Sequence, residues 1–267
     1  MGTNKHNFEN QIICGDCLSV MKDWPDGCVD LVVTSPPYNM RTRIRDGEYI
    51  TREQCDSDFS NKYKHFDDAL PIQAYFDLYY VILSELMRLS PLVIVNIGIV
   101  TGSKEAWFRL IGEYAECIKD IVIWDKGEGQ PAMHSAVINR SFELILLLES
   151  KGVAGRAFEK VYFERGTMPD IWRLGRGSNG DIEGHSAVFP ITLPQKAIKG
   201  WSRPGNLVLD PFCGSGTTCV AAKKLGRRYI GIDISEEYCQ IARDRIKAVD
   251  TGVPVKEARK GQIGLFE

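Results

Sequence analysis

The chain has 267 residues, 44% of them hydrophobic, which is enough to bury a sizeable core in one large domain or in one domain with an insert. Its 33 lysines and arginines nearly balance 35 acidic residues, so the formal charge of −2 neither announces a nucleic-acid partner nor excludes one that meets a local basic face. The N-terminus lacks the apolar core of a signal peptide and no apolar run approaches the length of a membrane span, which predicts a cytoplasmic protein without a membrane partner.

The first 150 residues alternate predicted strands with predicted helices. Apolar periodicity predicts helices over 71–89 and over 103–114, with Ser103 as the cap of the second, and a brief helix that ends at Met21. Residues 40–68 are polar and irregular, and this stretch is too long to be an idle connection. Short apolar runs predict strands over 11–14, 28–34, 92–97, 118–124 and 142–148.

The rest of the chain first breaks this pattern and then returns to it. Residues 151–186 carry seven glycines and six lysines or arginines without a regular period. Alternating strands and helices favour one α/β domain with a mostly parallel sheet covered on both faces. After residue 186 the pattern predicts a helix over 195–201, a strand over 207–209, a helix over 217–225, a strand over 229–232 and a helix over 235–248, capped by Ser235.

A rigid turn follows the predicted strand that ends at Thr34. Two consecutive prolines, Pro36 and Pro37, forbid both helix and further sheet pairing, so the chain stays extended just past the carboxyl end of a strand. Ligands bind at such ends in open α/β sheets. We expect the turn to grip an aromatic amine, with Ser35 Oγ and the Pro36 carbonyl accepting its N–H groups and the Tyr38 ring stacking on it.

A glycine-rich turn follows the strand at 207–209 and opens a helix. Its glycines let the backbone approach a ligand closely, and the helix N-terminus offers free N–H groups to a carboxylate or phosphate. A tight turn without any ligand has the same pattern. Asp233, 17 residues beyond Gly216, favours the ligand, because an acid near this spacing binds ribose hydroxyls. The turn reads Asp210-Pro211-Phe212-Cys213-Gly214-Ser215-Gly216-Thr217-Thr218.

Together, the Ser-Pro-Pro-Tyr turn and the glycine-rich turn resemble the motifs of the amino-methylating DNA methyltransferases that use S-adenosylmethionine (AdoMet). The catalytic motif precedes the glycine loop, an order similar to that of the beta group of this family. The resemblance implies a Rossmann-like fold with a mostly parallel seven-stranded sheet, helices on both faces and a small target-recognition insert. It divides one domain, residues 1–267, into a catalytic half at 11–150, the insert at 151–186 and an AdoMet-binding half at 187–248.

The resemblance also assigns single residues. Asp16 resembles the acid that contacts the adenine amine, and Asp233 the acid that holds the ribose. Ala187 and Phe189 lie in a segment beside the methionine end of the cofactor, where Ser186 replaces the proline that is more common in the family. The expected catalytic residues are Ser35, Pro36, Pro37 and Tyr38. The expected cofactor-binding residues are Asp16, Cys17, Ser35, Ala187, Phe189, Asp210, Pro211, Phe212, Cys213, Gly214, Ser215, Gly216, Thr217, Thr218 and Asp233.

The implied activity is site-specific methylation of an exocyclic amino group on a base flipped out of DNA. Ser-Pro-Pro-Tyr at 35–38 resembles the cytosine-N4 subgroup and Asp-Pro-Pro-Tyr the adenine-N6 subgroup, so we favour N4 of cytosine by a narrow margin over N6 of adenine. Methylation of RNA or of protein glutamine is less favoured, because those families place the glycine loop first. The intact motifs argue against an inactive DNA-binding regulator.

The implied partners are double-stranded DNA, a second copy of the chain and a cognate restriction endonuclease, in a bacterial, archaeal or phage context. No metal site is expected, because the cysteines are scattered apart from Cys14 and Cys17 and no ligand set surrounds the histidines. A solvated loop explains the arginines at 41–45 equally well, and five acids between 159 and 183 nearly cancel the later cations. The expected DNA-binding residues are Arg41, Arg43, Arg45, Asn139, Arg140, Arg173 and Arg176.

Overall fold

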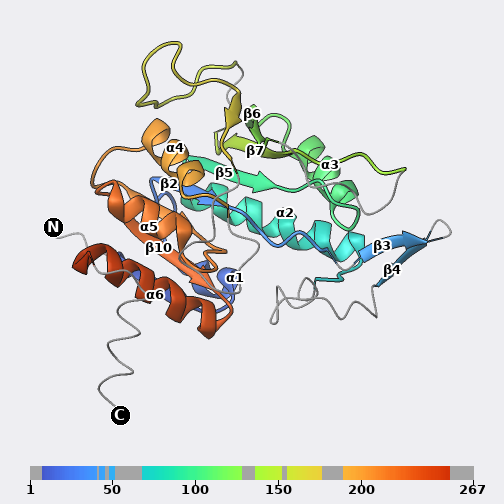
Figure 1. Ribbon diagram of the computed structural model, residues 1–267, viewed down its shortest axis with the longest axis horizontal. Helices are drawn as coiled ribbons and strands as arrows, with labels where there is room; N and C mark the ends of the chain where they lie inside the picture. Colours follow the sequence, from blue (N-terminus) through green and yellow to red (C-terminus); the bar gives the residue numbers. More distant parts are fainter. Residues whose placement is uncertain are drawn as a thin grey trace.

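The computed structural model describes residues 8–40, 42–45, 48–51, 68–127, 136–151, 155–175 and 189–252, and for 42–45 and 48–51 it describes the course of the backbone alone. No helix within these ranges is long and apolar enough to cross a membrane. In chain order (Figure 1) the elements are β1 (Gln11–Cys14), α1 (Cys17–Met21), β2 (Leu31–Thr34), β3 (Thr42–Arg45), β4 (Glu48–Thr51), α2 (Ile72–Leu89), β5 (Leu92–Ile97), α3 (Lys104–Glu113), β6 (Ile118–Asp125), β7 (Phe142–Glu149), β8 (Ile171–Arg173), α4 (Thr192–Trp201), β9 (Leu207–Asp210), α5 (Thr217–Lys224), β10 (Arg228–Asp233) and α6 (Glu236–Thr251).

Eight strands form one sheet in the order β1-β10-β9-β2-β5-β7-β6-β8. The pairs from β1 to β5 are parallel and β8 is parallel to β6, whereas β7 is antiparallel to both of its neighbours. Within the described sheet, β7 is therefore the one reversed strand. All seven predicted strands are present. The sheet has one strand more than expected, because β8 arises inside the segment predicted as a recognition insert.

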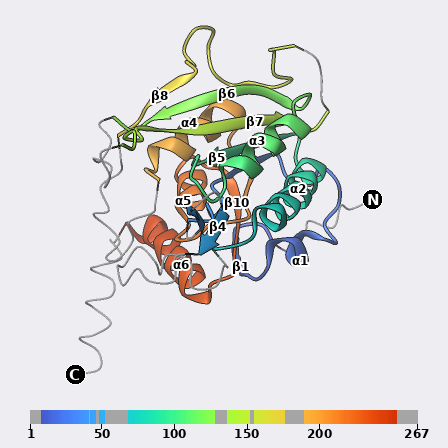
Figure 2. The same ribbon diagram turned by 90° about the vertical axis from the view of Figure 1, so that its right-hand side faces the viewer.

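Each strand sends alternate side chains into two separate hydrophobic cores. Leu31 and Val33 of β2 face the core that α4, α5 and α6 cover, and Val32 between them faces the core that α1, α2 and α3 cover. Figure 2 shows the two groups of helices on opposite sides of the sheet. A parallel sheet needs both faces covered, because its strands are apolar on both sides. The predicted layering is confirmed.

A two-stranded hairpin stands outside the main sheet. β3 and β4 pair antiparallel, with Thr42 opposite Thr51 and Arg45 opposite Glu48. The expectation of irregular chain was wrong over these residues. The sequence signal that would have found the hairpin is Asp-Gly at 46–47 between runs of β-branched residues, a pair typical of two-residue hairpin turns.

Two predicted helix caps have different outcomes. Ser235 caps α6 by accepting a hydrogen bond from the Tyr238 amide at 3.4 Å, as expected. Ser103 precedes α3, but its hydroxyl donates to the Gly98 carbonyl at 3.3 Å and makes no capping bond to the helix. The Ser103 side chain therefore fixes the turn after β5, and its predicted role as a cap was wrong.

The described part of the insert, residues 155–175, packs onto the sheet. β8 lies beside β6 with Trp172 opposite Trp124. Trp172 is fully buried, and its ring centre lies 6.4 Å from that of Trp201 in α4. Phe158 and Phe163 meet Trp201 edge-on at 5.4 and 5.3 Å. The insert and the sheet thus share one core.

Replacing Trp172 by alanine tests this shared core. Trp172→Ala should lower the free energy of unfolding by about 3–5 kcal/mol, because it removes buried apolar contacts and leaves a cavity. Urea unfolding followed by circular dichroism measures the loss. Phe142→Ala removes an aromatic side chain that is 49% exposed, so this control should change the free energy by less than about 0.5 kcal/mol. Equal effects of the two substitutions would contradict the shared core.

Candidate active site

Four neighbouring parallel strands, β1, β10, β9 and β2, end at the same edge of the sheet. Each end carries a residue predicted for the site: Asp16 after β1, Asp233 in β10, Asp210 in β9 and Ser35 after β2. A backbone hydrogen bond of 2.9 Å from the Gly15 amide to the Asp233 carbonyl joins the first two ends. The topology therefore gathers at one edge residues that lie far apart along the chain.

A buried hydrogen bond links the two motifs. Thr34 Oγ1 donates to Asp210 Oδ1 at 2.7 Å, and the Phe212 amide donates to the same oxygen at 3.1 Å. Asp210 is 1% exposed, and burial raises the pKa of its carboxyl group from 3.8 to about 6. The geometry thus gives Asp210 a role in positioning the glycine-rich turn, while its contact with a cofactor stays a prediction.

Helix α2 holds the catalytic motif from one side. The Pro37 carbonyl accepts hydrogen bonds from Tyr75 Oη at 2.7 Å and Tyr79 Oη at 3.3 Å. Both tyrosines are fully buried, so this grip is shielded from water. Because the Pro37 carbonyl is engaged, the Pro36 carbonyl is the backbone acceptor that the motif offers to a substrate.

Tyr38 and Asn39 are fixed by close packing beyond the prolines. Asn39 is buried with a φ of 56°, and its amide donates to the carbonyls of Leu70 and Gly102 at 2.9 and 2.8 Å. The Tyr38 ring lies directly on Gly98, where an added Cβ atom would come within 2.7 Å of ring carbon Cε2. Tyr38 itself stays partly exposed. A position without a side chain therefore sets where the ring lies.

A network of polar groups surrounds the hydroxyls of Ser35 and Tyr38, which lie 2.9 Å apart. Tyr38 Oη donates to Glu143 Oε2 at 2.9 Å, and Lys126 Nζ donates to Glu143 Oε1 at 2.8 Å. Asn96 Nδ2 lies 2.9 Å from Tyr38 Oη and 2.7 Å from Glu143 Oε2. The sequence reasoning missed Asn96, Lys126 and Glu143. Asn96 does carry a signal, because it is the single polar residue of the otherwise apolar β5.

Two glycines with positive φ shape the glycine-rich turn. Gly216, with a φ of 80°, packs against α6 so closely that an added Cβ would lie 2.7 Å from Ala242 Cβ. Gly214, with a φ of 49°, has open space at the same position, and its amide donates to Asp233 Oδ2 at 2.9 Å. The open side of Gly214 beside an acid fits the close approach of a ligand that carries a ribose.

Arg245 of α6, another residue that the sequence reasoning missed, supports this turn. Its guanidinium donates to the Ser215 carbonyl at 2.7 Å, to Ser215 Oγ at 3.1 Å and to Thr217 Oγ1 at 3.0 Å. Phe212 remains partly exposed. Most other predicted residues of the turn are buried and leave mainly backbone atoms for a ligand, namely Pro211, Cys213, Ser215, Thr217 and Thr218.

The remaining predicted cofactor residues differ in their surroundings. Asp16 is exposed and caps α1 by accepting a hydrogen bond from the Ser19 amide at 2.8 Å. Cys17 is buried in the core, and burial raises the pKa of its thiol to about 12, so its side chain acts as a packing group. Phe189 is partly buried against the other core. Ala187 lies outside the described residues.

The predicted DNA-binding residues lie on separate segments. Asn139 and Arg140 are exposed just before β7, whose first residues reach the catalytic edge. Arg173 is exposed at the end of β8, with its Nε 3.8 Å from Asp125 Oδ2. Arg43 and Arg45 are described by the backbone of β3 alone, and Arg41 and Arg176 lie outside the described residues.

One group of potential metal ligands occurs among the described residues. The thiols of Cys14 and Cys239 and the carboxylate of Glu236 lie within 4.8 Å of one another. The carboxylate of Glu236 pairs with Arg243, and burial raises the pKa of Cys239 to about 12. Both features oppose the binding of a cation, and we assign no metal to this group.

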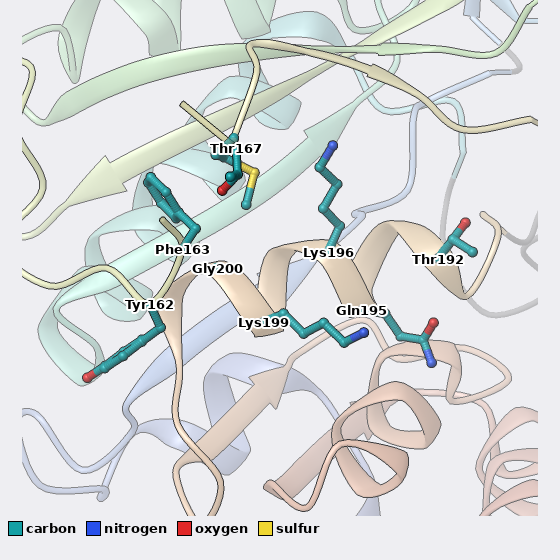
Figure 3. A pocket seen from close by; sticks show the side chains of 9 residues that line it. Tyr162, Phe163, Thr167, Thr192, Gln195, Lys196, Lys199 and Gly200 are labelled. Atoms are coloured by element: carbon teal, nitrogen blue, oxygen red, sulfur yellow. The ribbon is translucent and has the colours of Figure 1, made fainter. Parts of the chain in front are cut away.

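A hollow of about 400 Å³ lies between the insert and α4 (Figure 3), in a different place from the motifs. The insert contributes Tyr162 and Phe163 to its wall, and α4 contributes Lys196 and Lys199. Burial lowers the pKa of Lys196. None of the described residues that line the hollow is acidic, so it has no carboxylate that would accept a proton. The strand ends are the better site for chemistry.

The strand ends, and the order in which the two motifs reach them, define the class of protein: a methyltransferase that uses AdoMet and acts on amino groups. The chain belongs to the N6/N4 family of DNA methylases, whose model matches residues 29–244. It is an enzyme that transfers a methyl group from AdoMet to an exocyclic amino group in DNA. The predicted family, activity and cofactor are confirmed.

Known relatives cover most of the chain. Type II methyltransferase M.HinfI of Haemophilus influenzae is 27% identical over 270 residues, which cover 93% of this chain and 71% of that protein. The structure of the cytosine-N4-specific PvuII DNA methyltransferase has a TM-score of 0.67 and 20% identity, over 88% of this chain and 85% of that one. The structure of a DNA modification methylase of Thermus thermophilus, TTHA0409, complexed with S-adenosyl-L-methionine has a TM-score of 0.59 and 24% identity, over 89% and 93%. Both structures share the fold.

Two alanine substitutions should separate ligand binding from packing in the glycine-rich turn. Gly214→Ala and Gly216→Ala each place a side chain at positive φ, which costs about 1–2 kcal/mol of folding stability. Gly216→Ala should lose about 1–3 kcal/mol more, because its methyl group collides with Ala242. Gly214→Ala should instead weaken AdoMet binding by about tenfold or more. Urea unfolding and calorimetric titration measure the two effects, and unchanged AdoMet affinity in Gly214→Ala would contradict the assignment.

Asp210 should make stability depend on pH. Its pKa is raised in the folded protein, so the folded state binds the proton more tightly than the unfolded chain. This contribution to the free energy of unfolding is present below about pH 4 and is lost as the pH rises through about 6, by on the order of 3 kcal/mol. Asp210→Asn keeps an acceptor for Thr34 and should lack that loss. Parallel stability curves of the two proteins in urea between these pH values would refute the assignment.

Proposed function

We propose that the enzyme methylates N4 of cytosine in double-stranded DNA. The observation that carries this choice is the hydroxyl of Ser35 as the side-chain acceptor at the end of β2, because an aspartate there would resemble the adenine subgroup. Methylation of N6 of adenine is the alternative. Both amines present two N–H groups to the same pair of acceptors, so the difference lies in the fit of the base.

The chemistry follows from what an exocyclic amine needs. Its lone pair is delocalised into the ring, so it is a poor nucleophile until acceptors on its N–H groups draw electron density onto nitrogen. Ser35 Oγ and the Pro36 carbonyl serve as these acceptors, and the grip of α2 on Pro37 keeps them in place. Tyr38 stacks on the base. Positioning and electrostatics then dominate the rate.

The glycine-rich turn fits AdoMet. We assign the ribose hydroxyls to Asp233, the adenine amine to Asp16 and the close backbone approach to Gly214, whose open side has room for the ligand. When bound, AdoMet supplies a methyl group on a positively charged sulfur, so that the amine lone pair forms the new C–N bond and the electron pair of the S–C bond stays on sulfur. Thr34 and Asp210 hold the turn at its distance from Ser35.

The target amine lies inside the duplex, so the nucleotide has to leave the base stack. We propose that DNA lies along the catalytic edge, between the insert and the β3–β4 hairpin, which projects beyond the strand ends (Figure 1). Cations along this edge would contact phosphates. The candidates are Arg140 and Arg173, with Asn139 beside them, and on the less described segments Arg41, Arg43, Arg45 and Arg176.

Three further assignments belong to this proposal. The domain works as a catalytic half at 11–150, a recognition insert at 151–186 and a cofactor half at 187–248. A second copy of the chain supplements the insert, which is short for a recognition element. A cognate restriction endonuclease is the expected partner, in keeping with a relative described as a type II methyltransferase. The enzyme works in the cytoplasm, where its DNA is.

The modified nucleoside decides the base. Unmethylated DNA is incubated with the enzyme and AdoMet, hydrolysed and analysed by mass spectrometry, and we expect N4-methylcytosine. N6-methyladenine would overturn the choice of base and keep the class of reaction. Methyl transfer to RNA or protein, with none to DNA, would overturn the substrate.

Tyr38→Ala is the matched inactive variant in this experiment. It should abolish methyl transfer because the base loses its stacking partner, while AdoMet affinity measured by calorimetry should be unchanged. Equal loss of transfer and AdoMet binding would refute the division of labour between the two motifs.

A further inference from the structure

A chain of hydrogen bonds leads from the catalytic motif to a carboxylate that the proposed function does not use. Ser35 Oγ and Tyr38 Oη lie 2.9 Å apart, and Tyr38 Oη donates to Glu143 Oε2 at 2.9 Å. A phenol carries one proton and a carboxylate can only accept, so the Tyr38 proton is committed to Glu143. Ser35 must then donate to Tyr38, which leaves the lone pairs of Ser35 Oγ for an incoming amine.

The carboxylate at the end of this chain is held in place. Glu143 Oε1 accepts from Lys126 Nζ at 2.8 Å, and Glu143 Oε2 accepts from Asn96 Nδ2 at 2.7 Å. The side chains of Glu143 and Lys126 are each 15% exposed, and Asn96 is buried. Charges interact more strongly in such surroundings than in water. The negative charge of Glu143 therefore acts through Tyr38 on Ser35 and makes Ser35 Oγ a better acceptor.

We propose that Glu143 is the final acceptor of the proton that the amine loses on methylation. The amine proton passes to Ser35 Oγ, the Ser35 proton to Tyr38 Oη and the Tyr38 proton to Glu143 Oε2. Each hydroxyl ends with one proton, as it began, while the methylated amine and Glu143 both become neutral. Glu143 acts through two hydroxyls and does not touch the base. This relay rests on the proposed function, in which Ser35 and Tyr38 contact the flipped base.

The same two strands contain a control for a purely structural ion pair. At the other end of β6 and β7, Lys119 Nζ lies 3.2 Å from Glu149 Oε2, with side chains 3% and 11% exposed. Glu149 Oε1 also accepts from the Glu159 amide at 2.9 Å. Both lysine–glutamate pairs join β6 to β7, but Glu143 alone of the two glutamates is bonded to Tyr38. Comparison of the two pairs separates proton transfer from sheet stability.

Glu143→Gln keeps the length of the side chain and an acceptor oxygen but removes the charge. We expect the single-turnover rate of methyl transfer to fall about 100-fold, in the range of general-base effects. AdoMet affinity, measured by calorimetry, should stay unchanged. Glu149→Gln should keep the rate while it lowers the free energy of unfolding. A wild-type rate in Glu143→Gln, or equal loss of rate in both variants, would overturn the relay.

Tyr38→Phe is a second test, because it keeps the ring for stacking and removes the hydroxyl in the middle of the chain. Isotope-edited infrared difference spectra should show protonation of the Glu143 carboxylate during a single turnover of the wild type. This band should be missing in Tyr38→Phe and Glu143→Gln. A wild-type spectrum without it would sink the relay, whereas absence of methyl transfer by the wild type would refute the proposed function instead.

Discussion

The hydrogen bond from Thr34 to the buried carboxyl group of Asp210 holds the catalytic edge together. An acid that is shielded from water is costly unless its oxygens are engaged, so strands β2 and β9 cannot separate at this point without leaving that group unsatisfied. The Ser-Pro-Pro-Tyr turn leaves one of these strands and the glycine-rich turn leaves the other. Two segments from distant parts of the chain therefore behave as one rigid body, which is what a reaction governed by positioning requires.

The sequence was sufficient wherever the physical cause is local. Two prolines after an apolar run dictate an extended turn whatever surrounds it, and Gly214 and Gly216 dictate a backbone that most residues cannot adopt. The same holds for the seven predicted strands, each a short apolar run between polar segments. Parallel pairing then places every strand end at one edge, so the convergence of Ser35, Asp210 and Asp233 followed from the alternation of elements alone.

The sequence was insufficient where the cause is register or contact across the fold. Glu143 and Lys126 look like ordinary strand-end charges until β6 and β7 are paired and β7 is set beside β5. Arg245 reaches the glycine-rich turn only because Gly216 lets α6 pack close to it. β8 was missed because three residues are too few to show a period, although the buried Trp172 supplies most of its anchoring.

The reversal of β7 changes which end of a strand meets the substrate. A forward strand delivers its last residues to the working edge, whereas β7 delivers its first, so its glutamate arrives from the opposite direction. Since β6 and β7 are consecutive, their register places Trp124 opposite Glu143 whatever the length of the connection between the two strands. That connection is free to grow, shrink or change its side chains over evolutionary time without moving the acid. One ancestral scaffold can in this way acquire new sequence preferences while the arrangement that handles the proton is inherited intact.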